Sequence, residues 1–533
     1  MPLSRREALA RLAALTAMTA LPGCALSRSA GGAEPDPLDG TIAGYLAGFH
    51  RGTWSAEEVT AAALERCRTR GAALRAIDAL SATALDDARA ADGRRKAGTL
   101  RGPLDGVPVF AKSIYDMAGL PTTASSAEWA RLFPEPVGRD ALEVQRLRAA
   151  GAIVLGKTAA DDFAYEGEGT SSHTGQVLNP YDPTKSRTPG GSSAGSAVAV
   201  ACWMAFAALG TDDGGSNRIP AVCTGVVGMK PTFGLVPRTG VIPTWPYLDT
   251  HGPLARTVAD AALMLAIIAG PDASDPLALT GRWDGAPLAA LRDDALRGVR
   301  LGLVEAHVPR SQMTPGALAT WDRAVTDLRS AGATVEPFEP PVTLATFRRA
   351  FTDAAERRGD VAPDSRSPAA TANALYRYFA GRSDDPREAI RRGYPAYRAF
   401  YDVLPATFEE CEPLFGQPME RDGAGQSFAR SRTEVVAALG QAMRAAGVTA
   451  MTYPTMPFNA FPLPDEWPDI RTPLGYGNWL GLPEVSVPAG YDADGMPALN
   501  LSIVGLPGED AAVLALAHAY ERQSRRFVGA PTG

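Results

Sequence analysis

Lysine is almost absent from this chain of 533 residues, in which only five of the 52 basic residues are lysines. Where only a positive charge is needed, the chain uses arginine. A lysine that is kept in an apolar stretch therefore indicates a task that arginine cannot perform, namely the loss of a proton. The alternative is that such a lysine has survived codon bias by chance. The lysines are Lys96, Lys112, Lys157, Lys185 and Lys230.

The chain also lacks a basic stripe and a long apolar run. Acidic and basic residues are interspersed and the net charge is −7, which argues against a nucleic-acid partner. The apolar run at residues 12–21 is too short to span a bilayer. The length allows roughly two to four domains, and a hydrophobic content of 45% is enough for a large core.

Signals for metals, cofactors and disulfides are missing as well. The cysteines are scattered in a way that matches neither a zinc site nor a disulfide framework, so we expect buried free thiols. Neither a Gly-x-x-x-x-Gly-Lys loop nor a dinucleotide fingerprint is present, and we expect no cofactor and no metal. The cysteines are Cys24, Cys67, Cys202, Cys223 and Cys411.

The N-terminus has the pattern of an export signal. Arg5 and Arg6 precede the short apolar run, which is followed by Pro22, Gly23 and Cys24. This pattern predicts a twin-arginine signal over residues 1–24, with Cys24 as a candidate site for a lipid. We therefore expect an exported protein that is periplasmic, secreted or anchored to a membrane through Cys24. The alternative is an amphipathic N-terminus without a targeting role.

After a linker at residues 25–40, helical and strand patterns alternate through residues 41–530. A capping box at Ser55 and Glu58 opens a predicted helix. The short apolar run that follows Gly106 predicts a strand ending at Lys112. Without an internal repeat or an interdomain linker, residues 41–530 read as one α/β domain with a mixed sheet. Residues 355–440 are predicted to form a helical insertion over its core.

Two glycine- and serine-rich motifs carry the strongest chemical signal. The first includes Ser192 and Ser193, and the second includes Ser216, which follows two glycines. Consecutive glycines let backbone N–H groups converge on one point, and a helix beginning near Ser216 would add its positive end. The pattern favours an oxyanion hole beside a hydroxyl group. The alternative is an ordinary Gly/Ser-rich loop or a phosphate-binding turn.

A serine nucleophile needs a base. None of the five histidines has a recognisable triad context, and no Gly-x-Ser-x-Gly elbow stands out. His518 reads as a core-facing or capping residue, and His173 has no defined role. Lys112 is the better candidate, because burial at the end of an apolar strand lowers a lysine pKa from about 10.4 by several units. Lys157 and Lys230 are the alternatives, each also plausible as a structural ion-pair partner.

Residues 106–112, Gly-Val-Pro-Val-Phe-Ala-Lys, resemble the lysine motif of the amidase-signature hydrolases. The two glycine–serine motifs are similar to the other landmarks of that family. The likeness extends over most of the chain and implies an α/β fold with a central mixed β-sheet flanked by helices on both faces. Further similar segments are residues 179–183, 228–234, 249–258 and 481–490.

The resemblance implies a Ser–Ser–Lys triad. Ser216 would attack an amide carbonyl, and Ser192, after a cis peptide bond, would relay the proton to Lys112. Ser193 would support this network by hydrogen bonding.

The resemblance also implies an oxyanion hole and a brace behind it. Asp212 and Arg218 would brace the nucleophile loop as an ion pair. The oxyanion hole would consist of the backbone N–H groups of Asp213, Gly214, Gly215 and Ser216.

One departure from the family pattern concerns Asp213. Relatives usually carry Thr or Ile at this position, so here a carboxyl group adjoins the expected oxyanion hole. A carboxylate pointing inward would oppose the developing negative charge. We therefore expect Asp213 to point outward, toward Arg218 or another cation.

The sequence thus predicts an exported amide hydrolase that works through a serine acyl-enzyme and releases a carboxylate together with ammonia or an amine. The substrate is a small-molecule or peptide amide, in a pocket formed partly by residues 355–440 and 451–461. Alternatives are the glutamine-hydrolysing subunit of a tRNA-dependent amidotransferase, which an export signal disfavours, and a non-catalytic lipoprotein that binds an amide-bearing ligand. The sequence is compatible with a monomer or a homodimer.

Overall fold

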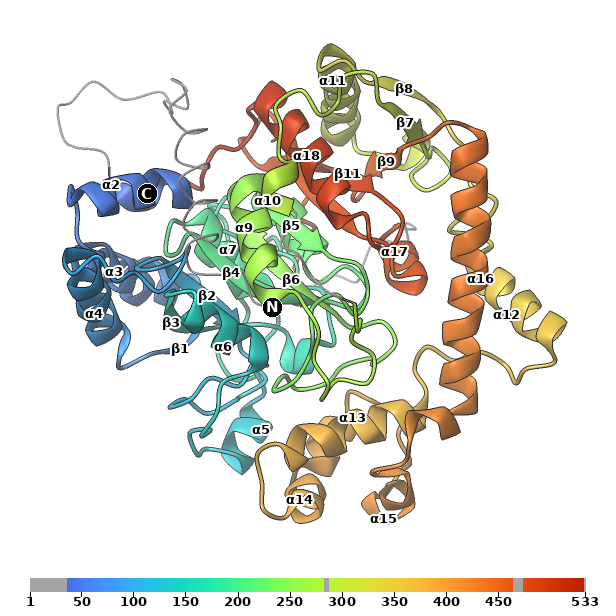
Figure 1. The fold of residues 1–533 in the computed structure, drawn as a ribbon, viewed down its shortest axis with the longest axis horizontal. Coiled ribbons are helices and arrows are strands. Elements are labelled where there is room, and N and C mark those ends of the chain that lie inside the picture. The colour runs from blue at the N-terminus through green and yellow to red at the C-terminus, as the bar shows by residue number, and fades with distance from the viewer. Residues whose placement is uncertain (1–35, 282–286, 464–472, 532–533) are drawn as a thin grey trace.

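A computed structural model describes residues 36–281, 287–463 and 473–531, and their strands form one sheet (Figure 1). The sheet has 11 strands in the order β1-β3-β2-β4-β6-β5-β10-β11-β9-β7-β8. The strands are β1 (Ile77–Leu80), β2 (Pro108–Lys112), β3 (Ile153–Thr158), β4 (Ala207–Asp212), β5 (Val227–Lys230), β6 (Thr250–Ala255), β7 (Arg300–Leu303), β8 (Thr334–Pro337), β9 (Ala450–Pro454), β10 (Glu484–Tyr491) and β11 (Pro497–Val504).

The sheet is mixed, as the sequence predicted. Strand β2 pairs in parallel with both β3 and β4, and β7 pairs in parallel with β8 and β9. Between these two parts, β4, β6, β5, β10, β11 and β9 pair antiparallel. Every residue of β2 to β6 is buried, which is expected of strands that are covered on both faces.

Two groups of helices cover the centre of this sheet. Helices α9 (Val258–Ile268) and α18 (Asp510–Ser524) pack on each other and on β5, β6 and β10. Helices α7 (Ala194–Ala201) and α8 (Arg218–Thr224) pack on each other, with α7 on β2 to β4 and α8 on β5, β10 and β11. The remaining helices of the core are α2 (Ile42–Arg51), α3 (Ala56–Arg66), α4 (Ala84–Lys96), α5 (Ala127–Leu132), α6 (Leu142–Ala149), α10 (Pro287–Ala290), α11 (Pro315–Ser330) and α17 (Leu474–Leu480).

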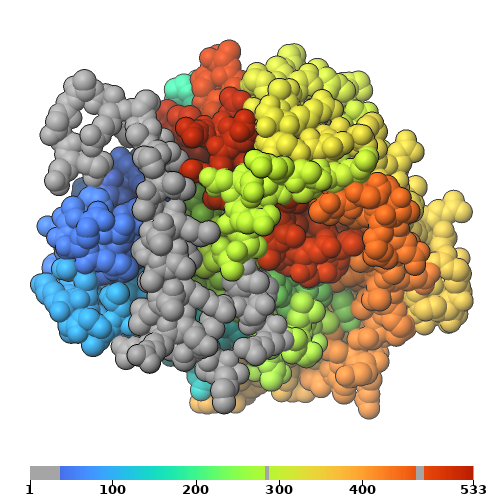
Figure 2. Space-filling view, turned by 45° about the horizontal axis from the view of Figure 1, so that its top comes forward, coloured from blue at the N-terminus to red at the C-terminus, as the bar shows by residue number. Residues whose placement is uncertain are grey.

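The helices predicted for residues 355–440 are present, in the connection between β8 and β9. The long helix α16 runs down one side of the molecule toward α13 and α14 (Figure 1). It also lies against the C-terminal part of the chain, where it contacts α17 (Figure 2). These helices are α12 (Phe347–Arg358), α13 (Pro368–Ala380), α14 (Pro386–Arg398), α15 (Phe408–Cys411) and α16 (Gly423–Ala445).

Local signals placed several elements well, but strand β4, which leads into the nucleophile motif, was missed. The capping box at Ser55 is formed, and Lys112 is the last residue of β2. The apolar stretch at residues 197–206 is not a single helix, because α7 ends at Ala201 and Trp203 turns the chain with φ 60°. The helix expected near Ser216 is present as α8, which begins at Arg218. Strand β4 lies in the sequence between the first motif and Ser216, and it was not predicted.

The cysteines that the structure describes, Cys67, Cys202, Cys223 and Cys411, are buried and unpaired, as expected. The predicted export signal, Cys24 and most of the linker lie outside the described residues. None of the helices in residues 36–281, 287–463 and 473–531 is long and apolar enough to cross a membrane.

Candidate active site

The sheet brings the lysine and the two serine motifs to one edge. Lys112 ends β2, and Asp212 ends the neighbouring strand β4, which runs parallel to β2. Because parallel strands end at the same edge of a sheet, Lys112 lies beside the loop that carries Ser216. Ser192 and Ser193 immediately precede α7, which packs against β4.

Lys112 and Ser192 are in direct contact. The lysine side chain is completely buried, and its Nζ donates to Ser192 Oγ over 2.7 Å and to Thr211 Oγ1 over 2.8 Å. The peptide bond between Gly191 and Ser192 is cis, as the resemblance implied. A neutral lysine in this place could accept a proton from the Ser192 hydroxyl group.

Burial lowers the pKa of Lys112 to about 8, although several carboxyl groups, Asp213 first among them, act in the opposite direction. This shift does not single out Lys112, because burial also lowers the pKa of Lys157 to about 8 and that of Lys230 to about 7. Only Lys112 contacts a serine of the two motifs.

The two alternative lysines have structural surroundings. Lys157 Nζ donates to the carbonyl of Pro121 and the hydroxyl of Thr122, and Lys230 Nζ donates to the carbonyl of Pro231. Neither forms an ion pair with a described residue. The ion-pair role considered for them from the sequence is therefore not found.

Ser216 is 7% exposed and lines a cavity of about 590 Å³. Its carbonyl accepts a hydrogen bond of 3.1 Å from the N–H of Ser193. The Ser193 hydroxyl in turn accepts from the N–H of Thr211 over 3.2 Å and so ties the first motif to β4. Among the hydrogen bonds of the described residues, none joins the hydroxyls of Ser192 and Ser216.

The loop before α8 offers fewer free N–H groups than the sequence suggested. The N–H of Gly215 donates to Asp212 Oδ1 over 2.8 Å, so Gly215 is not an available oxyanion donor. Asp212 also accepts from the N–H of Asn217 over 3.2 Å. The N–H groups of Asp213, Gly214 and Ser216 have no acceptor in the part of the chain that the structure describes.

The predicted ion pair between Asp212 and Arg218 is present and completely buried. Arg218 donates to both oxygens of Asp212, over 2.8 and 2.9 Å, and also to Glu484 over 2.7 Å. Burial would raise the pKa of Asp212, but the Arg218 guanidinium outweighs it and holds the pKa at about 2. Glu484, at the start of β10, was missed by the sequence reasoning. Its position inside the family-like segment 481–490 was the only available signal.

Replacing Arg218 with Met should cost about 3–5 kcal/mol of unfolding free energy, because Asp212 and Glu484 would stay buried without their cation. Chemical denaturation of the purified variant measures this loss. Arg349, whose side chain is 86% exposed, provides the matched control, and Arg349→Met should change stability by less than about 0.5 kcal/mol. Equal losses in the two variants would contradict a bracing role for Arg218.

The Asp213 side chain pairs with neither Arg218 nor another cation of the described residues, contrary to the expectation from the sequence. Arg218 is fully engaged by other groups, and Asp213 is one of the residues that line the same cavity as Ser216. Its Oδ1 accepts a hydrogen bond of 2.7 Å from the hydroxyl of Thr244. Burial and the neighbouring carboxylate of Asp249 raise the pKa of Asp213 well above its usual range.

The cavity at Ser216 has aromatic walls and charged side chains. Arg348 stacks on the ring of Trp479, and Arg366 stacks on the ring of Trp245, with guanidinium-to-centroid distances of 4.8 and 5.3 Å. Of the ranges predicted to form the pocket, residues 355–440 contribute the segment 363–366 and Tyr401. Residues 451–461 are not among the described lining residues.

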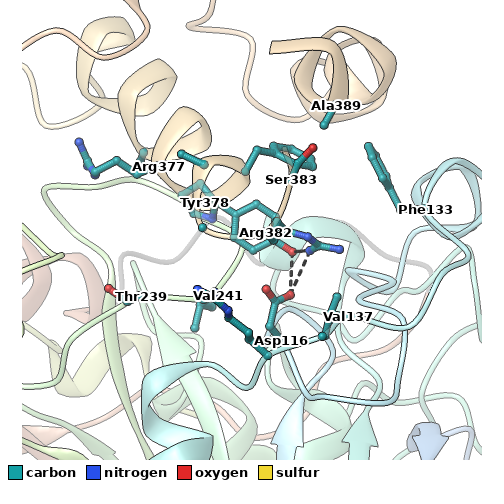
Figure 3. Close-up of a pocket in the computed structure, with 18 of the residues that line it drawn as sticks. Asp116, Phe133, Val137, Thr239, Val241, Arg377, Tyr378, Arg382, Ser383 and Ala389 are labelled. Atoms are coloured by element: carbon teal, nitrogen blue, oxygen red, sulfur yellow. Dashed lines mark hydrogen bonds and ion pairs between the residues drawn. The ribbon is translucent and has the colours of Figure 1, made fainter. Parts of the chain in front are cut away.

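A second cavity, of about 1090 Å³, lies between helices α13 and α14 and the core (Figure 3). On its wall Asp116 accepts hydrogen bonds from Arg382 over 3.0 Å and from Tyr378 over 2.9 Å. Neither Ser216 nor Lys112 is among its described lining residues, so it is separate from the serine cavity.

Among the described residues, no histidine ring forms a hydrogen bond with Ser192, Ser193 or Ser216. His251 is buried between Glu143, at 2.6 Å, and Asp249, at 3.3 Å. Although burial opposes it, these carboxylates raise the pKa of His251 to about 9. His518, expected to be a core or capping residue, bonds Asp293 over 3.2 Å.

Comparison with known proteins places this geometry in a family. The family model described as Amidase matches residues 58–514. The chain is 35% identical over 503 residues to a protein from Symbiobacterium thermophilum that is named as a subunit of glutamyl-tRNA(Gln) amidotransferase, covering 91% of this chain and 96% of that protein. A protein of the same name from Myxococcus xanthus is 35% identical over 515 residues, covering 92% and 98%.

A solved structure agrees with these sequence matches. The peptide amidase from Stenotrophomonas maltophilia superposes with a TM-score of 0.76 at 31% identity, covering 93% of this chain and 99% of that one. The described sheet and helices thus match the fold of an amidase-signature enzyme. The chain belongs to the amidase family.

Proposed function

We propose that this chain hydrolyses an amide C–N bond through an acyl-enzyme on Ser216, with Ser192 and Lys112 as the proton-transfer pair. The observation that carries this proposal is the 2.7 Å contact between the buried Nζ of Lys112 and Ser192 Oγ. It puts a titratable amine next to a serine whose neighbour, Ser193, donates its N–H to the carbonyl of the cavity-lining Ser216.

In the proposed reaction, Ser216 Oγ attacks the amide carbonyl while Ser192 takes its proton and passes its own to neutral Lys112. The oxyanion accepts from the free N–H groups of Asp213, Gly214 and Ser216. Lys112 then returns the proton through Ser192 to the departing nitrogen, and ammonia or an amine leaves. A water molecule attacks the ester by the same route and releases the carboxylate.

The pH dependence of kcat/KM tests the role of the lysine. Only the neutral amine is a base, and burial lowers the pKa of Lys112 to about 8. Hence kcat/KM should rise roughly tenfold per pH unit below about pH 8 and level off above it. The measurement is a profile from about pH 6 to 10 on one amide, at constant ionic strength. A flat profile over this range would mean that the base is not a lysine.

A fluorophosphonate probe tests the nucleophile directly. Peptide mapping after labelling should find the adduct on Ser216, and the Ser216→Ala protein should remain unlabelled. The alternative of a non-catalytic lipoprotein that binds an amide predicts no covalent labelling. Labelling at another serine would contradict the assignment even if the protein is active.

A second candidate is the glutamine-hydrolysing subunit of a tRNA-dependent amidotransferase, which the names of the relatives with 35% identity favour. The twin-arginine pattern at residues 4–24 argues against this candidate. From this pattern we propose that the protein is exported, whereas tRNA chemistry takes place in the cytoplasm. A panel that includes peptide C-terminal amides, alkyl and aryl carboxamides and glutamine, with product masses measured, separates the two. Turnover of glutamine alone would favour the amidotransferase role.

A further inference from the structure

The acidic side chains that line the cavity at Ser216 are not equivalent. Glu166 is exposed at its rim, and Asp364 belongs to the segment between α12 and α13. Asp213 instead lies in the nucleophile loop itself, three residues before Ser216. Its own N–H is one of the proposed oxyanion donors. A substrate group that meets the Asp213 side chain must therefore sit very close to the scissile carbonyl.

The two oxygens of the Asp213 carboxyl group differ in their hydrogen bonds. Oδ1 accepts from the buried hydroxyl of Thr244 over 2.7 Å, which fixes the carboxyl group. Oδ2 has no hydrogen-bond partner among the described residues. The carboxyl group is thus positioned by the protein, on a residue that lines the cavity, while one of its oxygens has no described hydrogen-bond partner.

No cation of the described residues pairs with this carboxyl group. Arg218 forms ion pairs with Asp212 and Glu484, and Arg238 donates hydrogen bonds to both carboxylate oxygens of Asp275. Lys112 is held by two hydroxyl groups.

The surroundings of Asp213 disfavour its negative charge. Three charged groups act on the Asp213 carboxylate. The carboxylates of Asp249 and Asp212 repel its negative charge, and Lys112 attracts it. Burial and Asp249 dominate and raise the pKa of Asp213. A cation supplied from outside would complete this site.

We propose that Asp213 selects substrates with a free amino group next to the scissile carbonyl, that is, amides of α-amino acids; this rests on the proposed function. An α-amino group has a pKa of about 7.7–8.0, so both of its forms are present near neutral pH. A neutral amine takes the proton of the Asp213 carboxyl group, and an ammonium ion meets the carboxylate. Both routes give the same ion pair at Oδ2, without any net gain or loss of a proton.

The test compares alaninamide with N-acetylalaninamide, which differ in the charge of the amino nitrogen. Wild type should show a kcat/KM at least tenfold higher for alaninamide. In Asp213→Asn and Asp213→Thr this ratio should fall to about one. Asn keeps the size of the side chain and an acceptor for Thr244, but it cannot form the ion pair.

Glu166→Gln is the matched control, because it removes an acidic group from the rim of the same cavity. Its ratio should stay within about twofold of wild type, since an exposed charge is screened by solvent. The proposal is overturned by a wild-type ratio near one, by an Asn variant that keeps the preference, or by a Glu166→Gln ratio that collapses equally. Melting temperature and probe labelling of each variant confirm that the protein compared is folded.

Failure of this inference is distinguishable from failure of the proposed function. If the probe labels Ser216 and both amides are cleaved equally well, the hydrolase assignment stands and the role of Asp213 is wrong. If neither labelling nor turnover of any amide occurs, the proposed function has failed, and the inference falls with it.

Discussion

Ser216→Ala should abolish amide turnover, with kcat reduced by several orders of magnitude and an unchanged melting temperature. The variant removes one hydroxyl group from a side chain that lines the cavity, and the Ser216 carbonyl that holds Ser193 is kept. Loss of a nucleophile in a unit of cooperating residues removes nearly all of the catalysis. The measurement is single-turnover and steady-state kinetics on one good amide.

Ser365→Ala serves as the control for this result. Ser365 is another buried serine in the lining of the same cavity, on the segment between α12 and α13. Its variant should still be labelled by the fluorophosphonate probe at Ser216. If Ser216→Ala retained more than about a hundredth of the wild-type kcat in a clean preparation, the nucleophile would have to be sought elsewhere.

Lys112→Arg should be nearly as inactive as Lys112→Ala, although it keeps the positive charge. Arginine stays protonated at any working pH, whereas the role proposed for Lys112 requires a neutral nitrogen 2.7 Å from Ser192 Oγ. We expect a loss of at least about a hundredfold in kcat, the scale of general acid–base catalysis. Steady-state kinetics together with the pH profile measure it.

Lys157 is the informative comparison for this prediction. Its pKa is also lowered to about 8 by burial, but its Nζ contacts only Pro121 and Thr122 among the described residues. Folded Lys157→Met protein should therefore keep its pH profile, even if its stability falls. An active Lys112→Arg enzyme would show that Lys112 acts only through its charge.

Amino-acid order alone was enough to predict the elements that local chemistry encodes. The capping box that begins α3 depends on Ser55 and Glu58, three positions apart. The burial of Lys112 follows from the apolar strand that it ends. The helices between β8 and β9 likewise lie where composition predicted them. The two serine motifs could be found in the same way, because each is contiguous, whereas the ion pair of Asp212 with Arg218 was expected from the family resemblance.

The tertiary structure decided what depends on groups far apart in the chain. Arg218 binds Glu484 as well as Asp212, although Glu484 lies 266 residues away in the sequence. The contact forms because β10 lies next to β5 in the centre of the sheet.

The direction of Asp213 is the clearest case. From charge alone, this carboxyl group is expected to contact a cation. In the fold, however, Arg218 binds Asp212, and the hydroxyl of Thr244 lies 2.7 Å from Asp213 Oδ1. Secondary structure is encoded by neighbours in sequence, whereas the direction of a side chain follows from which partners the fold leaves unoccupied.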